Sequence, residues 1–424
     1  MLIMNIPFFR ESEKKPIHLI MSVSSGGKST YIEKKTDFSK KRIPIYLANE
    51  LDKGGVDLSQ KLSKECIIHY NLFRPFGNNV NNIQRPFKTD QLLVSLLDKY
   101  AERLQVTMLI APKSVVAKRM LQRDTGEAFL RNHAEKTYPK YELFELLCSI
   151  DISDFYRKWY ELLEQYHISV RTRDSSNLSY KALGSKNEIS SIVNSSVYPV
   201  YSDDEIESII QEGRFEYQKI AITESVATKG QDRSLTFNLI ANHVSFYKKS
   251  VLDIGSAYGH FCFSAEEKGA NRVLGTELKS HRFVGANIIK QFKASSCEFI
   301  SSDVFSKPLG REFDIVLLLN VIHHLDNPIH ALHVAADLCN EVLVIEFPSI
   351  NDEKYKQTFV LEVEMGSEQP LIGVSLLDEQ DQTFVFNKEA IRRILMSHHK
   401  KYFSEVSFMQ SPIAEDRQIA ICRK

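Results

Sequence analysis

The 424-residue chain lacks several features that mark specialised protein classes. Its six cysteines form no CxxC pair and no Cys/His cluster with zinc spacing, so neither a disulfide framework nor a zinc site is indicated. No apolar stretch approaches the ~18–20 residues that cross a bilayer. Residues 1–15 lack the long apolar region and cleavage site of a signal peptide. We therefore expect a cytoplasmic protein with buried free thiols.

The chain also lacks net charge, because 54 Lys and Arg balance 54 Asp and Glu, and this excludes a polycation built for nucleic acid. The balance hides an asymmetry between the two halves. Residues 1–200 hold 30 basic and 22 acidic residues, and the remainder holds 24 and 32. A basic half suits an anionic ligand, although ordinary drift in surface charge explains the asymmetry equally well.

The length predicts two domains, and short apolar runs alternate with helical stretches in both halves. This alternation predicts an α/β protein with parallel sheets. A stretch rich in Ser, Asn and Asp suggests a linker. We expect a first domain at 1–185, a linker at 186–212 and a second domain at 213–424. In the first half the expected strands and helices are strands 17–21, 43–47, 66–73, 106–111 and 168–171, and helices 89–104, 114–123 and 152–165.

The second half predicts an open, doubly wound sheet of seven strands. Five strands alternate with helices, and a helix and two closing strands follow them. The strands are expected at 250–254, 272–276, 297–300, 313–319, 341–347, 406–410 and 418–423, and the closing helix at 388–399.

A glycine-containing loop follows the first of these strands and reads Asp253-Ile-Gly255-Ser256-Ala257-Tyr-Gly259. Glycine lets the backbone turn sharply and approach a ligand closely. The next strand ends at Glu277, where a carboxylate can accept both hydroxyls of a ribose. Another carboxylate, Asp303, follows the third strand. These groups are expected at one edge of the sheet, where open α/β sheets bind ligands.

In order and spacing these motifs resemble class I S-adenosylmethionine-dependent methyltransferases over residues 213–424. The resemblance implies that the loop wraps the methionine part of the cofactor and that Glu277 holds the ribose. It implies that Asp303 reads the adenine amino group, with Val304 packed beside the ring. The usual D-x-G-C-G-x-G departs here, because Ala257 replaces the middle glycine. The implied cofactor-binding residues are Asp253, Gly255, Ser256, Ala257, Gly259, Glu277, Asp303 and Val304.

The fourth strand runs into Asn320, His323 and His324, which we take as catalytic candidates. The sulfonium is already a strong electrophile, so the protein mainly aligns a nucleophile. An oxygen acceptor needs a general base, for which histidine is suited. Either histidine can equally pack or cap the next helix. Asn320 is expected to touch cofactor or acceptor, and Glu346 ends the fifth strand at the same edge or is simply solvated.

Two further segments of this half carry expectations. Residues 215–232 resemble the lead-in of a subgroup that includes tRNA wobble-uridine modifying enzymes, where this segment folds over the cofactor. We do not transfer the tRNA substrate on that resemblance. Residues 351–383 form an insertion before the last helix, and it is either an acceptor-binding lid or a dimerising hairpin.

The first half opens with a strand followed by Ser22-Val-Ser-Ser25-Gly26-Gly27-Lys28-Ser29-Thr30. This nearly matches the phosphate loop G-x-x-x-x-G-K-[ST], with Ser22 in place of the first glycine. The match implies a kinase-like P-loop NTP-binding domain that binds ATP with Mg²⁺, in which Lys28 reaches the phosphates and Ser29 ligates the metal. The expected nucleotide-binding residues are Ser25, Gly26, Gly27, Lys28, Ser29, Thr30, Arg119 and Arg123.

Two observations bear on the kinase prediction. Arg119 and Arg123 lie four apart on one helix, where they can neutralise transferred phosphate or form a solvated basic face. The strand at 66–73 carries Asn71 where a metal-associated acid often stands, which puts metal handling in doubt.

We therefore expect a bifunctional enzyme that transfers methyl groups from S-adenosylmethionine to a small-molecule or carbohydrate acceptor. Its N-terminal P-loop domain either phosphorylates the acceptor or regulates through nucleotide binding. One alternative is an RNA (tRNA) methyltransferase, which predicts a continuous basic face that the acidic second half disfavours. The other is a methyltransferase beside a degenerate, regulatory nucleotide-binding domain.

Overall fold

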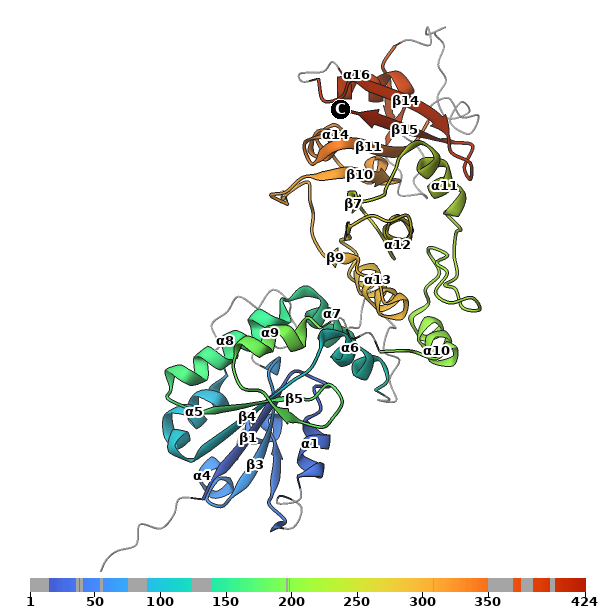
Figure 1. The fold of residues 1–424 in the computed structure, drawn as a ribbon. Coiled ribbons are helices and arrows are strands. Elements are labelled where there is room, and N and C mark those ends of the chain that lie inside the picture. Colours follow the sequence, from blue (N-terminus) through green and yellow to red (C-terminus); the bar gives the residue numbers. More distant parts are fainter. Residues whose placement is uncertain are drawn as a thin grey trace, which may run out of the picture. The chain divides into compact units, whose positions relative to one another are not determined.

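The computed structural model describes residues 15–35, 38, 41–53, 56–74, 90–123, 139–195, 197, 199–307, 309–349, 369–374, 384–396 and 401–424. The chain divides into two compact units, and the division falls between Pro199 and Val200. Each is an α/β structure (Figure 1). The region 186–212, expected as a linker, contains helices α9 (Asn187–Val193) and α10 (Asp203–Gly213) on either side of this division.

The first unit is built on a sheet of six strands in the order β2-β3-β1-β4-β5-β6. Five strands are parallel, and β6 pairs antiparallel with β5. The strands are β1 (Ile17–Ser22), β2 (Ile45–Leu47), β3 (Cys66–Asn71), β4 (Leu104–Ile110), β5 (Val170–Asp174) and β6 (Lys181–Ala182). The helices are α1 (Lys28–Lys34), α3 (Ala48–Leu51), α4 (Leu58–Lys61), α5 (Gln91–Tyr100), α6 (Lys113–Leu121), α7 (Pro139–Ser149), α8 (Ile152–Gln165) and α9.

Apolar side chains cover both faces of this sheet. Tyr31 and Ile32 of α1 pack in one cluster with Ile20, Ile67 and Leu109 of the central strands. A second group of rings, which includes Trp159 of α8, lies edge-on to Tyr70 of β3. Burial on both faces is the reason that these strands read as unbroken apolar runs rather than as an alternating pattern.

The second unit holds a sheet of seven strands in the order β14-β15-β11-β10-β7-β8-β9, with β15 antiparallel to both of its neighbours. The strands are β7 (Ser250–Ile254), β8 (Arg272–Thr276), β9 (Glu298–Ile300), β10 (Phe313–Leu319), β11 (Cys339–Pro348), β14 (Glu405–Gln410) and β15 (Arg417–Arg423), beside a separate pair, β12 (Ile372–Val374) and β13 (Phe384–Phe386). The helices are α10, α11 (Ser234–His243), α12 (His260–Glu267), α13 (Ser280–Lys293), α14 (Pro328–Asp337) and α16 (Lys388–Met396).

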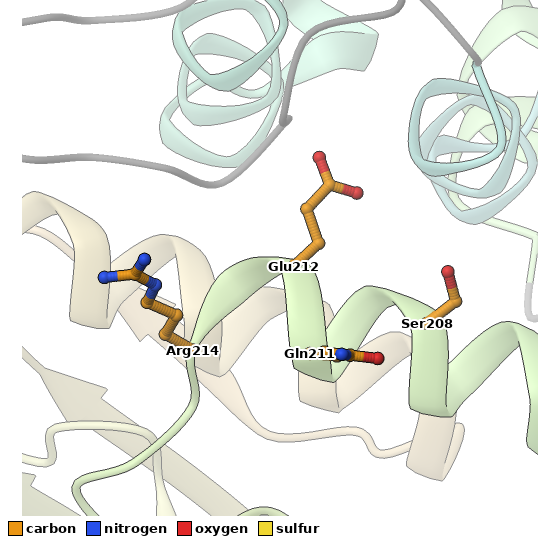
Figure 2. Close-up of a pocket in the computed structure, with 4 residues that line it drawn as sticks. All are labelled: Ser208, Gln211, Glu212 and Arg214. Atoms are coloured by element: carbon orange, nitrogen blue, oxygen red, sulfur yellow. The ribbon is translucent and has the colours of Figure 1, made fainter.

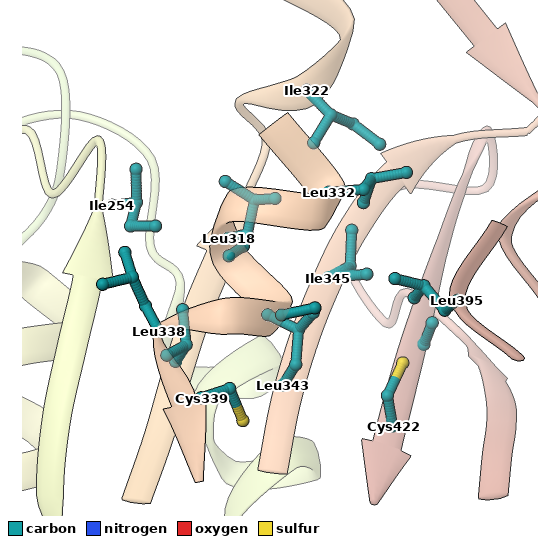
Figure 3. Packing of buried hydrophobic residues seen from close by; sticks show 14 of the residues in the cluster. Ile254, Leu318, Ile322, Leu332, Leu338, Cys339, Leu343, Ile345, Leu395 and Cys422 are labelled. Carbon is teal, nitrogen blue, oxygen red and sulfur yellow. The ribbon is translucent and has the colours of Figure 1, made fainter. Parts of the chain in front are cut away.

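The core of the second unit centres on strands β10, β11 and β15. Leu318, Ile345 and Cys422 of these strands are fully buried and pack with Leu332 of α14 and Leu395 of α16 (Figure 3). Within this sheet the β11–β15 pairing joins the residues furthest apart in sequence, because Val342 pairs with Arg423. The core holds the carboxyl ends of β10 and β11 in fixed positions, and the catalytic candidates stand at these ends.

The α/β class and the seven-stranded second sheet confirm the sequence predictions. The expected strand at 168–171 instead begins at Val170. Its first residues close helix α8, since Ile168 N donates to Leu163 O and His167 adopts a left-handed φ of 59°. Of the expected insertion 351–383, only residues 369–374 lie within the described part of the chain.

Several other predictions concern the chain as a whole. All six cysteines are free thiols; Cys148 is half-buried and the other five are buried, as predicted. Within the described ranges, no helix is long and apolar enough to cross a membrane. In the same ranges no cluster of three or more His, Cys, Asp or Glu side chains can hold a metal ion.

Candidate functional site

In the second unit, β7 lies where the strand order changes direction, between β10 and β8. A crevice is expected outside the carboxyl ends of strands at such a point. The loop that leaves β7 there uses three left-handed residues, Gly255 (φ 75°), Ala257 (φ 49°) and Gly259 (φ 90°). A Cβ on Gly255 would stand 2.6 Å from Val321 Cγ2, and one on Gly259 would stand 2.6 Å from Phe299 Cζ. Glycine is therefore required at both positions.

Three predicted carboxylates surround this loop. Glu277, buried at the end of β8, accepts hydrogen bonds from Ala257 N at 3.0 Å and from Lys279 N at 2.8 Å. Asp253, also buried, accepts a hydrogen bond from Cys262 Sγ at 3.4 Å. Burial raises the pKa of Asp253 to about 7, and the Glu277 charge adds to the rise. The loop thus lies between two buried carboxyl groups, of which Asp253 is partly protonated at neutral pH.

The remaining predicted cofactor residues lie at the same edge. Asp303 follows β9, and its carboxylate accepts hydrogen bonds from Phe305 N and from Ser306 Oγ. The Ser306 hydrogen bond is the main cause that lowers the pKa of Asp303 below its ordinary value. Val304 is buried in the core cluster. Ser256 Oγ is buried and has no hydrogen-bond partner among the described residues, so it can serve a bound ligand.

The lead-in segment 215–232 contacts this loop and the start of α12. Gln218 Oε1 accepts hydrogen bonds from Tyr258 N at 3.0 Å and from His260 N at 3.5 Å. His260 Nδ1 lies 3.0 Å from Lys219 O. The ring of Phe215 packs on Tyr258 with centroids 5.2 Å apart. These contacts cover the loop and the start of α12.

Asn320 stands at the end of β10 in a left-handed conformation (φ 59°), and its side chain is held from both ends. Its Nδ2 donates to Glu346 Oε2, and its Oδ1 accepts from Arg417 Nη1. Glu346 is fully buried and also accepts from Ser411 Oγ at 2.7 Å, with Arg233 Nη1 at 3.8 Å. Glu346 is therefore not a solvated strand end, because it joins four separate segments of the chain.

The two histidines after β10 differ in their surroundings. His323 is buried, and its Nε2 lies 3.3 Å from Arg417 Nη1. Because the guanidinium can only donate, Nε2 is the acceptor and its lone pair is occupied. Burial, followed by the Arg417 and His324 charges, lowers the pKa of His323 to about 2. This geometry gives no support to His323 as the base. His324 is exposed, with its ring 4.0 Å from that of His323.

In the first unit, the loop after β1 also leaves its sheet where the strand order changes direction. Ser25 (φ 58°) and Gly27 (φ 88°) are left-handed. A Cβ on Gly26 would stand 1.9 Å from Ser22 Oγ, which donates to Leu109 O at 2.7 Å. The replacement of the first motif glycine by Ser22 thus ties the loop to β4.

Lys28 is buried under this loop, where its Nζ donates to Ser22 O at 2.9 Å and to Val23 O at 2.7 Å. Burial, with the nearby Arg123 charge, lowers the pKa of Lys28 to about 7. Ser29 is exposed at the start of α1, and Thr30 is half-buried. The structure therefore brings the motif lysine to the loop.

The two predicted arginines have different roles in this structure. Arg123 Nη1 donates to Ser24 Oγ at 3.3 Å and so reaches the loop. Arg119 Nη2 donates to the carbonyl oxygens of Ser175 and Ser176 at 2.7 and 2.8 Å, which secures the segment after β5. Its Nη1 would lie 3.6 Å from a Cβ on Gly27, is buried, and has no hydrogen-bond partner among the described residues.

Hollows of the second unit lie away from these residues. One, of about 430 Å³, runs along the last turns of α10 and is lined by Ser208, Gln211, Glu212 and Arg214 (Figure 2). A neighbouring hollow of about 560 Å³ extends to the lead-in segment. Neither includes a predicted site residue. We place the candidate site at the strand ends, because loop geometry, charge and ordered side chains converge there.

Residues 231–397 match the protein-family model described as a methyltransferase domain. The matched range contains the loop, the three carboxylates and both histidines. The second unit thus contains a region similar to methyltransferase domains. The N-terminal unit lies outside the matched range.

Curated relatives show weaker, shorter similarity. The tRNA U34 carboxymethyltransferase of Helicobacter acinonychis is 27% identical over 155 residues, which are 32% of this chain and 55% of that relative. The enzyme of the same name from Alteromonas mediterranea is 29% identical over 105 residues, 23% of this chain and 32% of the relative. The chain thus spans between a third and about half of the length of these relatives.

Solved structures overlap the chain in part. The N-terminal domain of EvdMO1, solved with SAH and D-fucose, is 14% identical and covers 53% of this chain and 97% of its own, with a TM-score of 0.39. The magnesium protoporphyrin IX methyltransferase of Synechocystis PCC 6803, solved with SAH, is 15% identical. It covers 45% of this chain and 82% of its own, with a TM-score of 0.34.

The sequence analysis did not identify three residues that hold Asn320 and Glu346 in place at the carboxyl ends of β10 and β11. Arg233, Ser411 and Arg417 come from the end of the lead-in segment and from the last strand pair. No local motif marks them, since each is brought in by tertiary contacts. Gln218 lies in the lead-in segment 215–232, but the sequence analysis did not single it out.

Proposed function

We propose that the methyltransferase domain binds S-adenosylmethionine at the carboxyl ends of β7 to β10 and uses it to methylate an acceptor. The observation that carries the proposal is the buried Glu277 beside the left-handed loop at the change of strand order. Its carboxylate oxygens retain lone pairs for two ribose hydroxyls. The unpartnered Ser256 Oγ supplies a further polar contact.

When bound, the cofactor supplies an electrophilic methyl group. The task of the chain is then to orient the acceptor and exclude water. Asn320 is suited to line the acceptor site, because the hydrogen bonds with Glu346 and Arg417 fix its position. His324, exposed at the same edge, is the candidate general base for a hydroxyl acceptor.

We propose a small molecule or carbohydrate as the acceptor. RNA is the alternative, which the names of the curated relatives support. One feature of the sequence also favours it: residues 213–300 hold twelve Lys and Arg against eight Asp and Glu, although the second half as a whole is acidic. Methyl transfer from labelled S-adenosylmethionine to a tRNA pool or to sugar acceptors separates the two classes.

For the N-terminal unit we propose binding of a phosphate-bearing ligand such as ATP. Support comes from the buried Lys28 and from Arg123 at the loop after β1. Phosphoryl transfer to the acceptor is one use of such a site, and regulation of the methyltransferase domain is the other. Asn71 at the end of β3 favours regulation, since a kinase commonly has an acid near its metal.

Calorimetry with S-adenosylmethionine tests the first proposal. We expect saturable binding by the wild type and loss of binding in Asp253→Ala, with retained fold by circular dichroism. His324→Ala should bind the cofactor normally and lose about 100-fold or more in turnover once an acceptor is found. Absence of cofactor binding by the folded wild type would refute the proposal.

A further inference from the structure

The phosphate-loop motif implies a Mg²⁺ ion beside the bound phosphates, held by the motif hydroxyl and by an acid at a neighbouring strand end. The hydroxyl is present as Ser29. The neighbouring strand is β3, which pairs with β1 so that Asn71 lies beside Ser22. Asn71 Oδ1 accepts a hydrogen bond from Phe73 N at 3.1 Å. The side chain at this position is therefore neutral and serves the turn after β3.

Three carboxylates beyond the carboxyl ends of these strands have other roles. Arg74 pairs with both Asp52 and Asp90. Asp90 is 1% exposed, accepts a hydrogen bond from Tyr70 and caps helix α5. Asp174, at the end of β5, accepts from Ser176 N at 2.8 Å. Each stabilises the fold, and none contacts the loop in the structure described.

Basic side chains, by contrast, gather at the loop. Lys28 lies beneath it, Arg123 reaches it at Ser24, and Arg119 Nη1 lies beside Gly27. The Lys28 and Arg123 charges also act on His69 of β3. Burial, together with these charges, lowers the pKa of His69 to about 4. The imidazole is thus neutral at physiological pH and adds no further positive charge near the loop. Among the residues that the structure describes, the donor set at the loop does not fit Mg²⁺, a hard cation that prefers carboxylate and water oxygens.

We propose that the N-terminal unit binds the phosphate groups of its ligand without a divalent cation, with their charge neutralised by Lys28, Arg119 and Arg123. This inference rests on the phosphate site proposed above and specifies the form of its ligand. Phosphate oxygens would replace the carbonyl oxygens of Ser22 and Val23 as partners of Lys28 Nζ. Metal-free ATP presents all of its negative phosphate charge to these side chains. In Mg–ATP the metal already neutralises part of that charge.

The test is calorimetric titration of the full chain with ATP and with inorganic triphosphate, first in EDTA and then in excess Mg²⁺. We expect both probes to bind in EDTA and to bind several-fold more weakly in Mg²⁺. Lys28→Ala should weaken binding in EDTA by tenfold or more, since it removes a charge-assisted contact. Lys99→Ala, an exposed lysine of α5, is the matched control and should bind as the wild type does.

Asn71→Asp sharpens the test, because aspartate can accept the same hydrogen bond from Phe73 N and preserve the turn. The added charge should weaken binding in EDTA and reverse the preference toward Mg–ATP. Binding by the wild type only in Mg²⁺, with no change in Asn71→Asp, overturns the metal-free inference and leaves the phosphate site standing. Failure of both probes under both conditions overturns the phosphate site itself.

Discussion

The first loops of the two units have the same backbone design and opposite electrostatics. Each follows the strand at which the order of its sheet changes direction. Each ends in a left-handed glycine that precedes a helix, Gly27 (φ 88°) and Gly259 (φ 90°). Each carries a left-handed residue with a side chain two positions earlier, Ser25 (φ 58°) and Ala257 (φ 49°).

The side chains around the two loops differ in sign. Lys28 and Arg123 reach the first loop, and Asp253 and Glu277 flank the second. The backbone therefore forms the same kind of loop in each unit, and the side chains around the two loops distinguish the ligands that we propose for them. Phosphate is the ligand proposed for the first loop, and S-adenosylmethionine, with its positive sulfonium and ribose hydroxyls, is the one proposed for the second. The charge asymmetry between the halves of the sequence has this local counterpart.

The largest expected effect concerns pH. The pKa of Asp253 is raised from 3.8 to about 7, so the folded state holds a proton that the unfolded state has lost. Its contribution to stability is complete below pH 3.8 and is lost as the pH rises to about 7. Between pH 5 and 7 we expect a loss of roughly 2–3 kcal/mol in the free energy of unfolding of the second unit. Denaturant titrations at both pH values measure it.

The unfolding free energy of Asp253→Asn should be insensitive to pH over that window. If it falls with pH as in the wild type, the effect does not come from Asp253.

Lys28 provides the opposite case in the first unit. Its pKa is lowered from 10.5 to about 7, so its contribution to stability is present above pH 10.5 and is lost as the pH falls to about 7.

Comparable in size is the effect of a methyl group on the two capping glycines. Gly259→Ala adds a left-handed Cβ 2.6 Å from the ring of Phe299, so we expect a loss of about 3 kcal/mol in the unfolding free energy of the second unit. Gly27→Ala meets the flexible end of Leu178 at 3.3 Å and should cost about 1–2 kcal/mol. Chemical denaturation of each variant measures the difference; equal losses would mean that the second loop is less tightly packed than described.

Glu277→Gln should weaken S-adenosylmethionine binding by about 10- to 100-fold, because a hydrogen bond to a charged group contributes about 1.5–3 kcal/mol. Metal-free ATP binding should not change. Calorimetry with both ligands measures this selectivity. Glu267→Gln, an exposed carboxylate at the end of α12, is the control and should retain both affinities. Unaltered cofactor affinity in Glu277→Gln would remove Glu277 from the site.

The smallest effects are expected at the two left-handed residues with side chains. Ala257→Gly relieves a strain of about 1–2 kcal/mol but adds unfolded-state entropy of about 0.5–1 kcal/mol. We expect a net gain of under about 1 kcal/mol in the second unit, and a similar gain for Ser25→Gly in the first. Thermal unfolding measures both; a destabilised Ala257→Gly would show that the methyl group packs favourably.

The sequence predicted what is local along the chain. Both loops, the carboxylates after β8 and β9, and nearly all strands follow from short apolar runs and from the residues directly after them. Helix α8 was predicted with its bounds, because its apolar residues recur at helical spacing. The seven strands of the second sheet, five that alternate with helices and a closing pair, were also predicted, but their spatial order was not.

What the sequence did not reveal depends on distant contacts. The network around Glu346 joins Arg233, Asn320, Ser411 and Arg417, which lie up to 184 positions apart in the numbering. No periodicity or motif connects such residues. The distinction between His323 and His324 likewise depends first on the burial of His323 in the folded chain and then on Arg417 of strand β15. Adjacent residues of the same type thus acquire different chemistry from the fold alone.

The most direct test of the account is a set of calorimetric titrations with two ligands and three proteins. S-adenosylmethionine and metal-free ATP are each titrated into the wild type, Glu277→Gln and Lys28→Ala. We predict that the wild type binds both ligands, and that each variant loses affinity for one ligand and keeps the other. Loss of both ligands in a folded variant, or failure of the wild type to bind either, would contradict two loops with opposite charge and separate ligands.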